Sequence, residues 1–322
     1  MSDALSQIAE DYDAFYDEKI APKLRNLEAQ RRNTVYGIAA LSAIAVFGLL
    51  GFIYHEELAT RFGISENVIA ISAMLALVGG GGLAFAVYTR IRDMVKAALV
   101  APTCAFLGLD YSLKGDGFPL TRFDEGGILP KYDKSKLQDR IRGSHDGVAF
   151  ELCEAHLEVV STTRRSGNKE TEYQRVFDGL LLIYHFPKSF RGHTVVVPDR
   201  TWLGNKIAGR KHGERVMLED PRFEEIYAAF SDDQVEARYL LTPTFMERLT
   251  ALAEHLSARN ALAFAFQDND LLIAFHSKVG HFEGGSLFKP LENPERSKQL
   301  LEELRMIYDL VERLNLINRT GI

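Results

Sequence analysis

Cysteine is scarce in this chain, and a net positive charge is absent. Two of its 322 residues are cysteines, Cys104 and Cys153, which is too few for a disulfide framework and typical of a reducing compartment. Neither lies in a Cys-x-x-Cys pair or a Cys/His cluster, so a structural zinc site is not expected. The formal net charge of −6 argues against general nucleic-acid binding. The composition therefore predicts neither a cofactor nor a nucleic-acid partner.

The common catalytic motifs are missing as well. The sequence contains no P-loop, Gly-x-Ser-x-Gly or His-Glu-x-x-His motif, and no Gly-x-Gly-x-x-Gly between a strand and a helix. Glu154 and His156 share one face of a predicted strand. His185 and His193 flank a turn and could meet across a hairpin, with Asp199 as the nearest third metal ligand. An ordinary hydrogen-bonded histidine pair is the favoured interpretation, so no catalytic or metal-binding residue is assigned.

Two long runs lack charge altogether. Residues 34–54 and 68–88 each span 21 residues without Asp, Glu, Lys or Arg. As a helix, each run would be about 32 Å long, the thickness of a bilayer core. The first run starts too late and is too long for a secretory signal. We therefore predict a transmembrane helical hairpin with a short external loop at 55–67.

The basic residues flanking these runs predict their orientation. Only Arg61 lies between the runs, whereas eight basic residues flank them on the other side, so the positive-inside rule puts both termini in the cytoplasm. This divides the chain into an N-terminal cytoplasmic amphipathic helix at 1–33, the two spans with their loop, and a cytoplasmic domain at 89–322. The eight residues are Lys19, Lys23, Arg25, Arg31, Arg32, Arg90, Arg92 and Lys96.

Four consecutive glycines interrupt the second run. Lipid enforces a helix even across poor helix formers, and small residues let membrane helices approach closely. We expect the glycines to pack against the small-residue side of the first run or against a second copy; a local flexible point is the alternative. The predicted contact residues are Gly79, Gly80, Gly81 and Gly82 in the second run and Gly37, Ala40 and Ala43 in the first.

The remaining residues mix strand and helix patterns. Strand patterns cover 147–161, 176–186, 193–198 and 234–241, and two short strands flank a turn at 268–270. Helix patterns begin at Pro221 and Thr242, and a long amphipathic helix covers 296–317. Because the strands do not alternate regularly with helices, the pattern predicts an α+β domain with an antiparallel sheet and a long C-terminal helix. By analogy, such a sheet fits a pleckstrin-homology module.

One basic segment, residues 200–215, contains the only tryptophan. We consider contact with anionic lipid through Trp202, Lys206, Arg210 and Lys211. The alternative, which we favour, is a solvated loop with Trp202 in the core.

Four segments together resemble a known family. They are "FYDEKIAPKLRNLEAQRR", "FDGLLLIYHFPKSFRGHTVVVPD", "SDDQVEARYLLTPTFMERL" and "LAFAFQDNDLLIAF". The chain resembles a bacterial family of two-span membrane proteins catalogued as domain of unknown function 3137. The resemblance implies a bacterial membrane protein with a cytoplasmic domain, and it implies no activity.

We therefore expect an integral inner-membrane protein that presents a cytoplasmic binding or scaffolding domain. Its expected partners are the lipid bilayer and either another protein or a second copy of the chain. A non-enzymatic role is favoured. The alternatives are a membrane-bound enzyme with a site near His185 and His193, or an accessory subunit of a transporter.

Overall fold

The structure is a computed structural model that divides into two compact units. A helical unit comprises Met1–Phe106 and Glu283–Leu300, and a sheet unit comprises Leu107–Phe282 and Leu301–Ile322. The described residues are 11–145, 147–165, 168–186, 189–199, 213–255, 261–277, 280–282 and 289–305.

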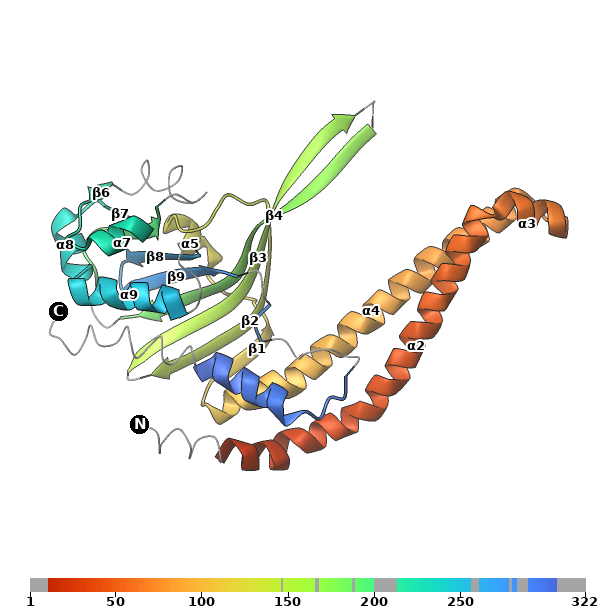
Figure 1. Ribbon diagram of the computed structural model, residues 1–322, viewed down its shortest axis with the longest axis horizontal. Helices are drawn as coiled ribbons and strands as arrows, with labels where there is room; N and C mark the ends of the chain where they lie inside the picture. Colours follow the sequence, from red (N-terminus) through yellow and green to blue (C-terminus); the bar gives the residue numbers. More distant parts are fainter. Residues whose placement is uncertain are drawn as a thin grey trace. The chain divides into compact units, whose positions relative to one another are not determined.

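Two long antiparallel helices dominate the helical unit. Helices α2 (Ala21–Ile53) and α4 (Glu66–Phe106) pack side by side, and the short helix α3 (His55–Phe62) lies between them in the chain (Figure 1). Both are long and apolar enough to cross a membrane, as the two uncharged runs predict. Each extends beyond its run, α2 at its N-terminal end and α4 at its C-terminal end. The π-helix η1 (Tyr16–Ile20) leads directly into α2, which has Pro22 in its first turn.

Buried hydroxyl groups join the helical segments around Tyr12. Tyr12 Oη lies 2.9 Å from Thr103 Oγ1 on α4 and also forms a hydrogen bond with Ser297 Oγ. Arg25 Nε on α2 donates a hydrogen bond to Glu292 at 2.9 Å. Residues 294–305, which carry Ser297, are helical; they are the described part of the predicted C-terminal helix.

The sheet unit is built on one antiparallel sheet of nine described strands. Their order is β1-β2-β3-β4-β9-β8-β5-β7-β6. The strands are β1 (Asp110–Lys114), β2 (Lys134–His145), β3 (Val148–Arg165), β4 (Asn168–His185), β5 (Thr194–Pro198), β6 (Glu214–Val216), β7 (Tyr227–Ser231), β8 (Leu262–Gln267) and β9 (Asp270–His276). This confirms the predicted α+β class with an antiparallel sheet.

Short helices accompany the sheet. They are α5 (Leu120–Glu125), α7 (Pro221–Ile226), α8 (Gln234–Leu240) and α9 (Pro243–His255). The strand predicted at 234–241 is wrong, because these residues form α8. The Asp233 carboxylate accepts hydrogen bonds from the backbone N–H of Val235 and of Glu236, both at 3.0 Å. This N-cap satisfies amide groups that would otherwise lack partners, and so favours helix over strand.

Alternate side chains of the central strands build the core. Cys153, Leu181, Leu272 and Ala265, from four strands, belong to one buried cluster with Phe123 of α5. The strands approach closely where β4 meets β9. A Cβ atom at Gly179, where φ is +155°, would clash with the carbonyl oxygen of Phe275, so this position requires glycine.

The β3–β4 hairpin extends beyond the sheet as a two-stranded arm (Figure 1). Strand β2 pairs with β3 only as far as Glu158, and β9 pairs with β4 only from Gly179. Among the described residues, no third strand pairs with the arm, which we define as residues 159–165 and 168–175. The likeness to a pleckstrin-homology sheet stays a prediction.

Candidate functional site

Close helix contact involves one of the four predicted glycines. A Cβ atom at Gly80 of α4 would lie 2.8 Å from the carbonyl oxygen of Leu41 on α2. A Cβ atom at Gly48 of α2 would lie 2.6 Å from the carbonyl oxygen of Ala73 on α4. The two backbones therefore come into contact at two points, which lie seven residues apart on each helix. This close approach is possible because glycine has no side chain.

The other predicted contact residues lie away from this interface. A Cβ atom at Gly79, Gly81, Gly82 or Gly37 would meet nothing within 4 Å, and Ala40 and Ala43 are exposed. Within the chain, the helix contact thus uses Gly80 of α4 and Gly48 of α2. Gly48 was not among the predicted contact residues. The sequence signal for Gly48 is its spacing. Leu41 and Gly48 are seven residues apart on α2, as are Ala73 and Gly80 on α4.

The predicted lipid-contact residues, Trp202, Lys206, Arg210 and Lys211, lie outside the described residues. That hypothesis stays a prediction.

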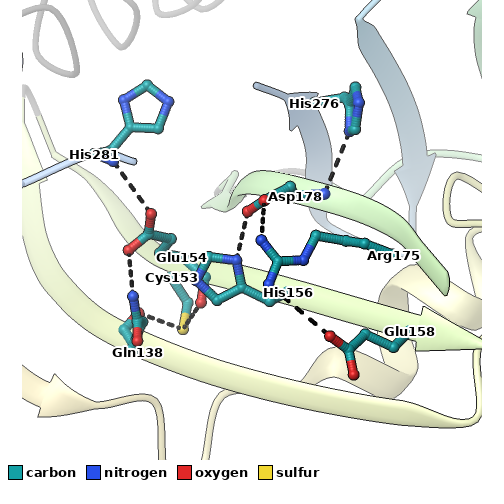
Figure 2. Close-up of polar contacts among 9 residues, drawn as sticks. All are labelled: Gln138, Cys153, Glu154, His156, Glu158, Arg175, Asp178, His276 and His281. Atoms are coloured by element: carbon teal, nitrogen blue, oxygen red, sulfur yellow. Dashed lines mark hydrogen bonds and ion pairs between the residues drawn. The ribbon is translucent and has the colours of Figure 1, made fainter. Parts of the chain in front are cut away.

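A polar cluster forms where β3, β4 and β9 meet (Figure 2). The register of β3 and β4 brings Asp178 opposite His156. His156 Nδ1 forms a hydrogen bond with Asp178 Oδ1, and Arg175 Nη1 donates to Asp178 Oδ2 at 2.8 Å. Asp178 thus links a histidine to an arginine, an arrangement that fixes the imidazole orientation.

Glu154 has partners other than His156. Its side chain is buried, with the residue 1% exposed. Its carboxylate accepts a hydrogen bond from Gln138 Nε2 at 2.8 Å and one from the backbone N–H of His281 at 3.2 Å (Figure 2). A buried carboxylate requires such donors because its desolvation is costly. The i, i+2 pattern puts Glu154 and His156 on one face, where Glu154 accepts from Gln138 and His281 and where His156 forms a hydrogen bond with Asp178.

Two further histidines border the cluster. His276 Nδ1 accepts a hydrogen bond from the backbone N–H of Asp178 at 3.3 Å. Burial lowers the pKa of His281, although the nearby Glu154 and Asp178 oppose the shift. Its Nε2 atom is buried without a hydrogen-bond partner in the described part of the chain. His281 is therefore favoured in its neutral form.

His185 belongs to a second set of the same kind. His185 Nδ1 lies 2.7 Å from Asp270 Oδ1, and Arg122 forms an ion pair with the same carboxylate. Arg122 also donates to Asp268 at 3.0 Å. Asp270 is fully buried, whereas the His185 side chain is 42% exposed. Arg122 thereby links α5 to the β8–β9 turn.

His193 and Asp199 have different partners. The backbone N–H of His193 donates to Asp232 at 2.6 Å, and burial lowers the pKa of its imidazole. Asp199 pairs with Arg215 at 3.7 Å. The described contacts therefore do not join the three residues considered as metal ligands. Across the described ranges, no group of three or more His, Cys, Asp or Glu side chains is arranged to hold a metal ion.

Both thiols are shielded. Cys104 and Cys153 are fully buried. Burial raises the pKa of Cys153 to about 12, and its thiol donates to the carbonyl oxygen of Gln138 at 3.3 Å. A protonated, buried thiol is a poor nucleophile. Taken together, the hydrogen bonds of the polar cluster and of the His185 set orient imidazole rings, and their carboxylates connect neighbouring strands.

Comparisons with known proteins find a family match for residues 175–316. No curated protein matches the chain. Among solved structures, the chain is similar to one titled "crystal structure of the mycobacterial trehalose monomycolate transport factor A, TtfA", with 8% sequence identity and a TM-score of 0.35 over 69% of this chain and 94% of that chain. A likeness this weak supports no conclusion about function. Residues 175–316 match the family described as "Protein of unknown function (DUF3137)", which supports the family resemblance of the sequence over that part of the chain.

Proposed function

We propose that this protein is an integral membrane protein in which α2 and α4 anchor an α+β domain that acts as a binding or scaffolding module. One observation carries the proposal: large apolar side chains on both helices are exposed. In the most apolar 18-residue stretch of each helix, only 6% of the residues are buried in the helix that ends at Ile53 and 17% in α4. A core helix of a soluble protein would bury its apolar face.

The exposed side chains follow the uncharged runs. Phe47 is 74% exposed on α2, and Leu75 and Phe85 are 69% and 70% exposed on α4. Leaving such surface in water costs roughly 25 cal/mol per Å². A bilayer removes this cost, and both runs are long enough to cross its core. The exposed set on the two runs is Tyr36, Ile44, Val46, Phe47, Leu49, Leu50, Phe52, Ile53, Tyr54, Val68, Ile71, Met74, Leu75, Val78, Leu83 and Phe85.

The orientation that we propose follows from the charges at the two ends of the helix pair. Arginines gather where α2 enters its uncharged run and where α4 leaves its own, whereas Glu56, Glu57 and Glu66 lie at the opposite end. Basic residues favour the cytoplasmic side. We therefore propose an inner-membrane location with both termini in the cytoplasm and α3 outside.

The arm supports a binding role for the domain. The backbone N–H of Val160, at the base of the arm, donates to the Asp133 carboxylate at 2.7 Å. Beyond that contact, no third strand pairs with the arm among the described residues, and unpaired strand edges favour pairing with another chain. Ser161, Thr162 and Tyr173 of the arm are exposed. The proposed partner is another protein or a second copy of this chain.

Single cysteines test the anchoring and its orientation. Thr60→Cys on α3 and Asp110→Cys on β1 introduce exposed thiols, and the native Cys104 and Cys153 are buried, so background labelling should be low. We expect an impermeant thiol reagent to label Thr60→Cys in intact cells and Asp110→Cys only after lysis. Labelling of Asp110→Cys but not Thr60→Cys in intact cells would contradict the orientation.

A further inference from the structure

The helix contact defines a register that places three arginines at about the same level along the helix pair. Leu41 lies against Gly80, and Gly48 lies against Ala73, so the two helices pair in opposite directions residue for residue. Continuing this register by ten residues along both helices carries Arg31 level with Arg90. Arg32 then lies at the same level, and Arg92 lies within about one helical turn of it.

Arg32, Arg90 and Arg92 retain accessible positive charge. Arg32 and Arg90 are exposed, and within the described ranges neither forms an ion pair with an acidic side chain. The Arg92 side chain is 32% exposed and, within the described part of the chain, pairs with its neighbour Asp93 at 3.3 Å. Arg31 differs, because its guanidinium is held by Glu28 at 2.5 Å and is mostly buried. We call Arg32, Arg90 and Arg92 the arginine collar.

Aromatic and apolar side chains adjoin the collar on the membrane side. Tyr36, one helical turn from Arg32, is 73% exposed, and Tyr88 is close to Arg90 in the chain. Tyrosine favours the level of lipid headgroups. The exposed apolar surface of both helices begins just beyond. The opposite end of the pair carries the acidic residues Glu56, Glu57 and Glu66 around Arg61.

We infer that the arginine collar binds the phosphate groups of anionic phospholipids in the leaflet on the collar side. This rests on the proposed membrane anchoring and adds a lipid class and a binding site to it. A guanidinium presents paired donors that match phosphate oxygens. Cationic side chains at a membrane surface favour anionic over zwitterionic lipid. The adjoining apolar surface contacts the acyl chains, so the collar selects a phospholipid over free phosphate.

The collar can be tested with the full chain in lipid nanodiscs. The discs contain phosphatidylcholine and phosphatidylglycerol, and the ratio of the two lipids retained after transfer to detergent is measured. We expect the parent to retain an excess of phosphatidylglycerol over the bulk ratio. The R32Q/R90Q/R92Q variant should lose at least about fivefold of that excess, the factor expected from one basic residue near an anionic surface. The matched control is R61Q, an exposed arginine on α3, which should behave as the parent.

Three outcomes overturn the inference: no excess in the parent, the same excess in the triple variant, or an equal loss in R61Q. Membrane retention is measured separately for each variant. If the parent is not retained in membranes, the proposed anchoring fails. If the parent is retained but shows no lipid preference, only the collar fails. If the triple variant itself is not retained, the single variants R32Q and R90Q are compared with R61Q, and equal lipid ratios in all three also overturn the inference.

Discussion

The Cα of Gly80 faces the backbone of Leu41 so closely that a methyl group there would lie 2.8 Å from the Leu41 carbonyl oxygen. Its neighbours Gly79, Gly81 and Gly82 have open space at the corresponding position. Four identical residues in a row therefore have different roles, and only one of them sets how closely α2 and α4 approach.

This difference predicts the outcome of substitutions at adjacent glycines. Gly80→Leu should separate α2 from α4 at a cost of about 1–2 kcal/mol, the scale of single contacts in membranes. Gly81→Leu is the matched control and should have little effect on this pair. Both variants should still enter the membrane, because leucine is favourable there.

A disulfide reports the separation. A Cβ atom at Gly51 would lie 3.4 Å from Ala73 Cβ, close to the spacing that a disulfide needs. Cysteines at Gly51 and Ala73 should therefore crosslink within one chain when an oxidant is added. Gly80→Leu should reduce the yield and Gly81→Leu should not. Equal yields in both variants would exclude Gly80 as a contact residue.

The buried hydroxyl group of Tyr12 should contribute measurably to stability. Tyr12→Phe removes the hydrogen bonds to Thr103 and Ser297 and should cost about 1 kcal/mol. Tyr36→Phe is the control, because Tyr36 is 73% exposed. Thermal unfolding in detergent should show a lower midpoint for Tyr12→Phe alone; an unchanged midpoint would mean that the network contributes nothing.

The lowered pKa of His281 predicts that the stability of the fold changes in mild acid. Burial lowers its pKa in the folded state, so below the unfolded value of about 6.5 the unfolded chain binds a proton that the folded chain does not. Stability should therefore fall as the pH drops through that value, until the folded imidazole also binds a proton. Replacing His281 by Gln should make the difference between melting temperatures at pH 7.5 and 5.5 smaller. A difference as large as the parent's would contradict this assignment.

The arm should be dispensable for folding. Val160 pairs with Tyr173 across the hairpin, so residues 161–172 can be replaced by an Asn-Gly turn, which suits a two-residue hairpin. The melting temperature should change by no more than a few degrees, because the described strand residues 161–165 and 168–172 pair only with each other. Crosslinking to the partner in native membranes should be lost. A shortened chain that unfolds, or that keeps its crosslinks, would contradict the proposed role.

Local signals in the sequence predict part of this structure. The two long helices follow from uncharged runs, and the β8–β9 hairpin follows from apolar segments around Asp268, whose φ of 56° suits an aspartate in a turn. The strand wrongly predicted at 234–241 shows the limit of such signals. A seven-residue amphipathic segment satisfies both strand and helix patterns, and the N-cap at Asp233 decides between them.

Long-range register explains what sequence patterns miss. His156 and Asp178 meet only because β3 and β4 pair in one register, and that register includes an irregularity at Leu157 and Glu158. Likewise, Gly48 contacts Ala73 through the antiparallel packing of two helices. Residue spacing within a single helix or strand reveals neither contact. The polar cluster and the contact at Gly48 were therefore found only in the structure.

Alkaline carbonate extraction tests the membrane anchoring most directly. Membranes from cells that express the full chain are washed at high pH, which releases peripheral proteins, and are then pelleted. Because α2 and α4 expose apolar side chains along two uncharged runs of 21 residues, the account predicts that the chain stays in the pellet and is released only by detergent. Recovery of the folded chain in the carbonate supernatant would contradict it.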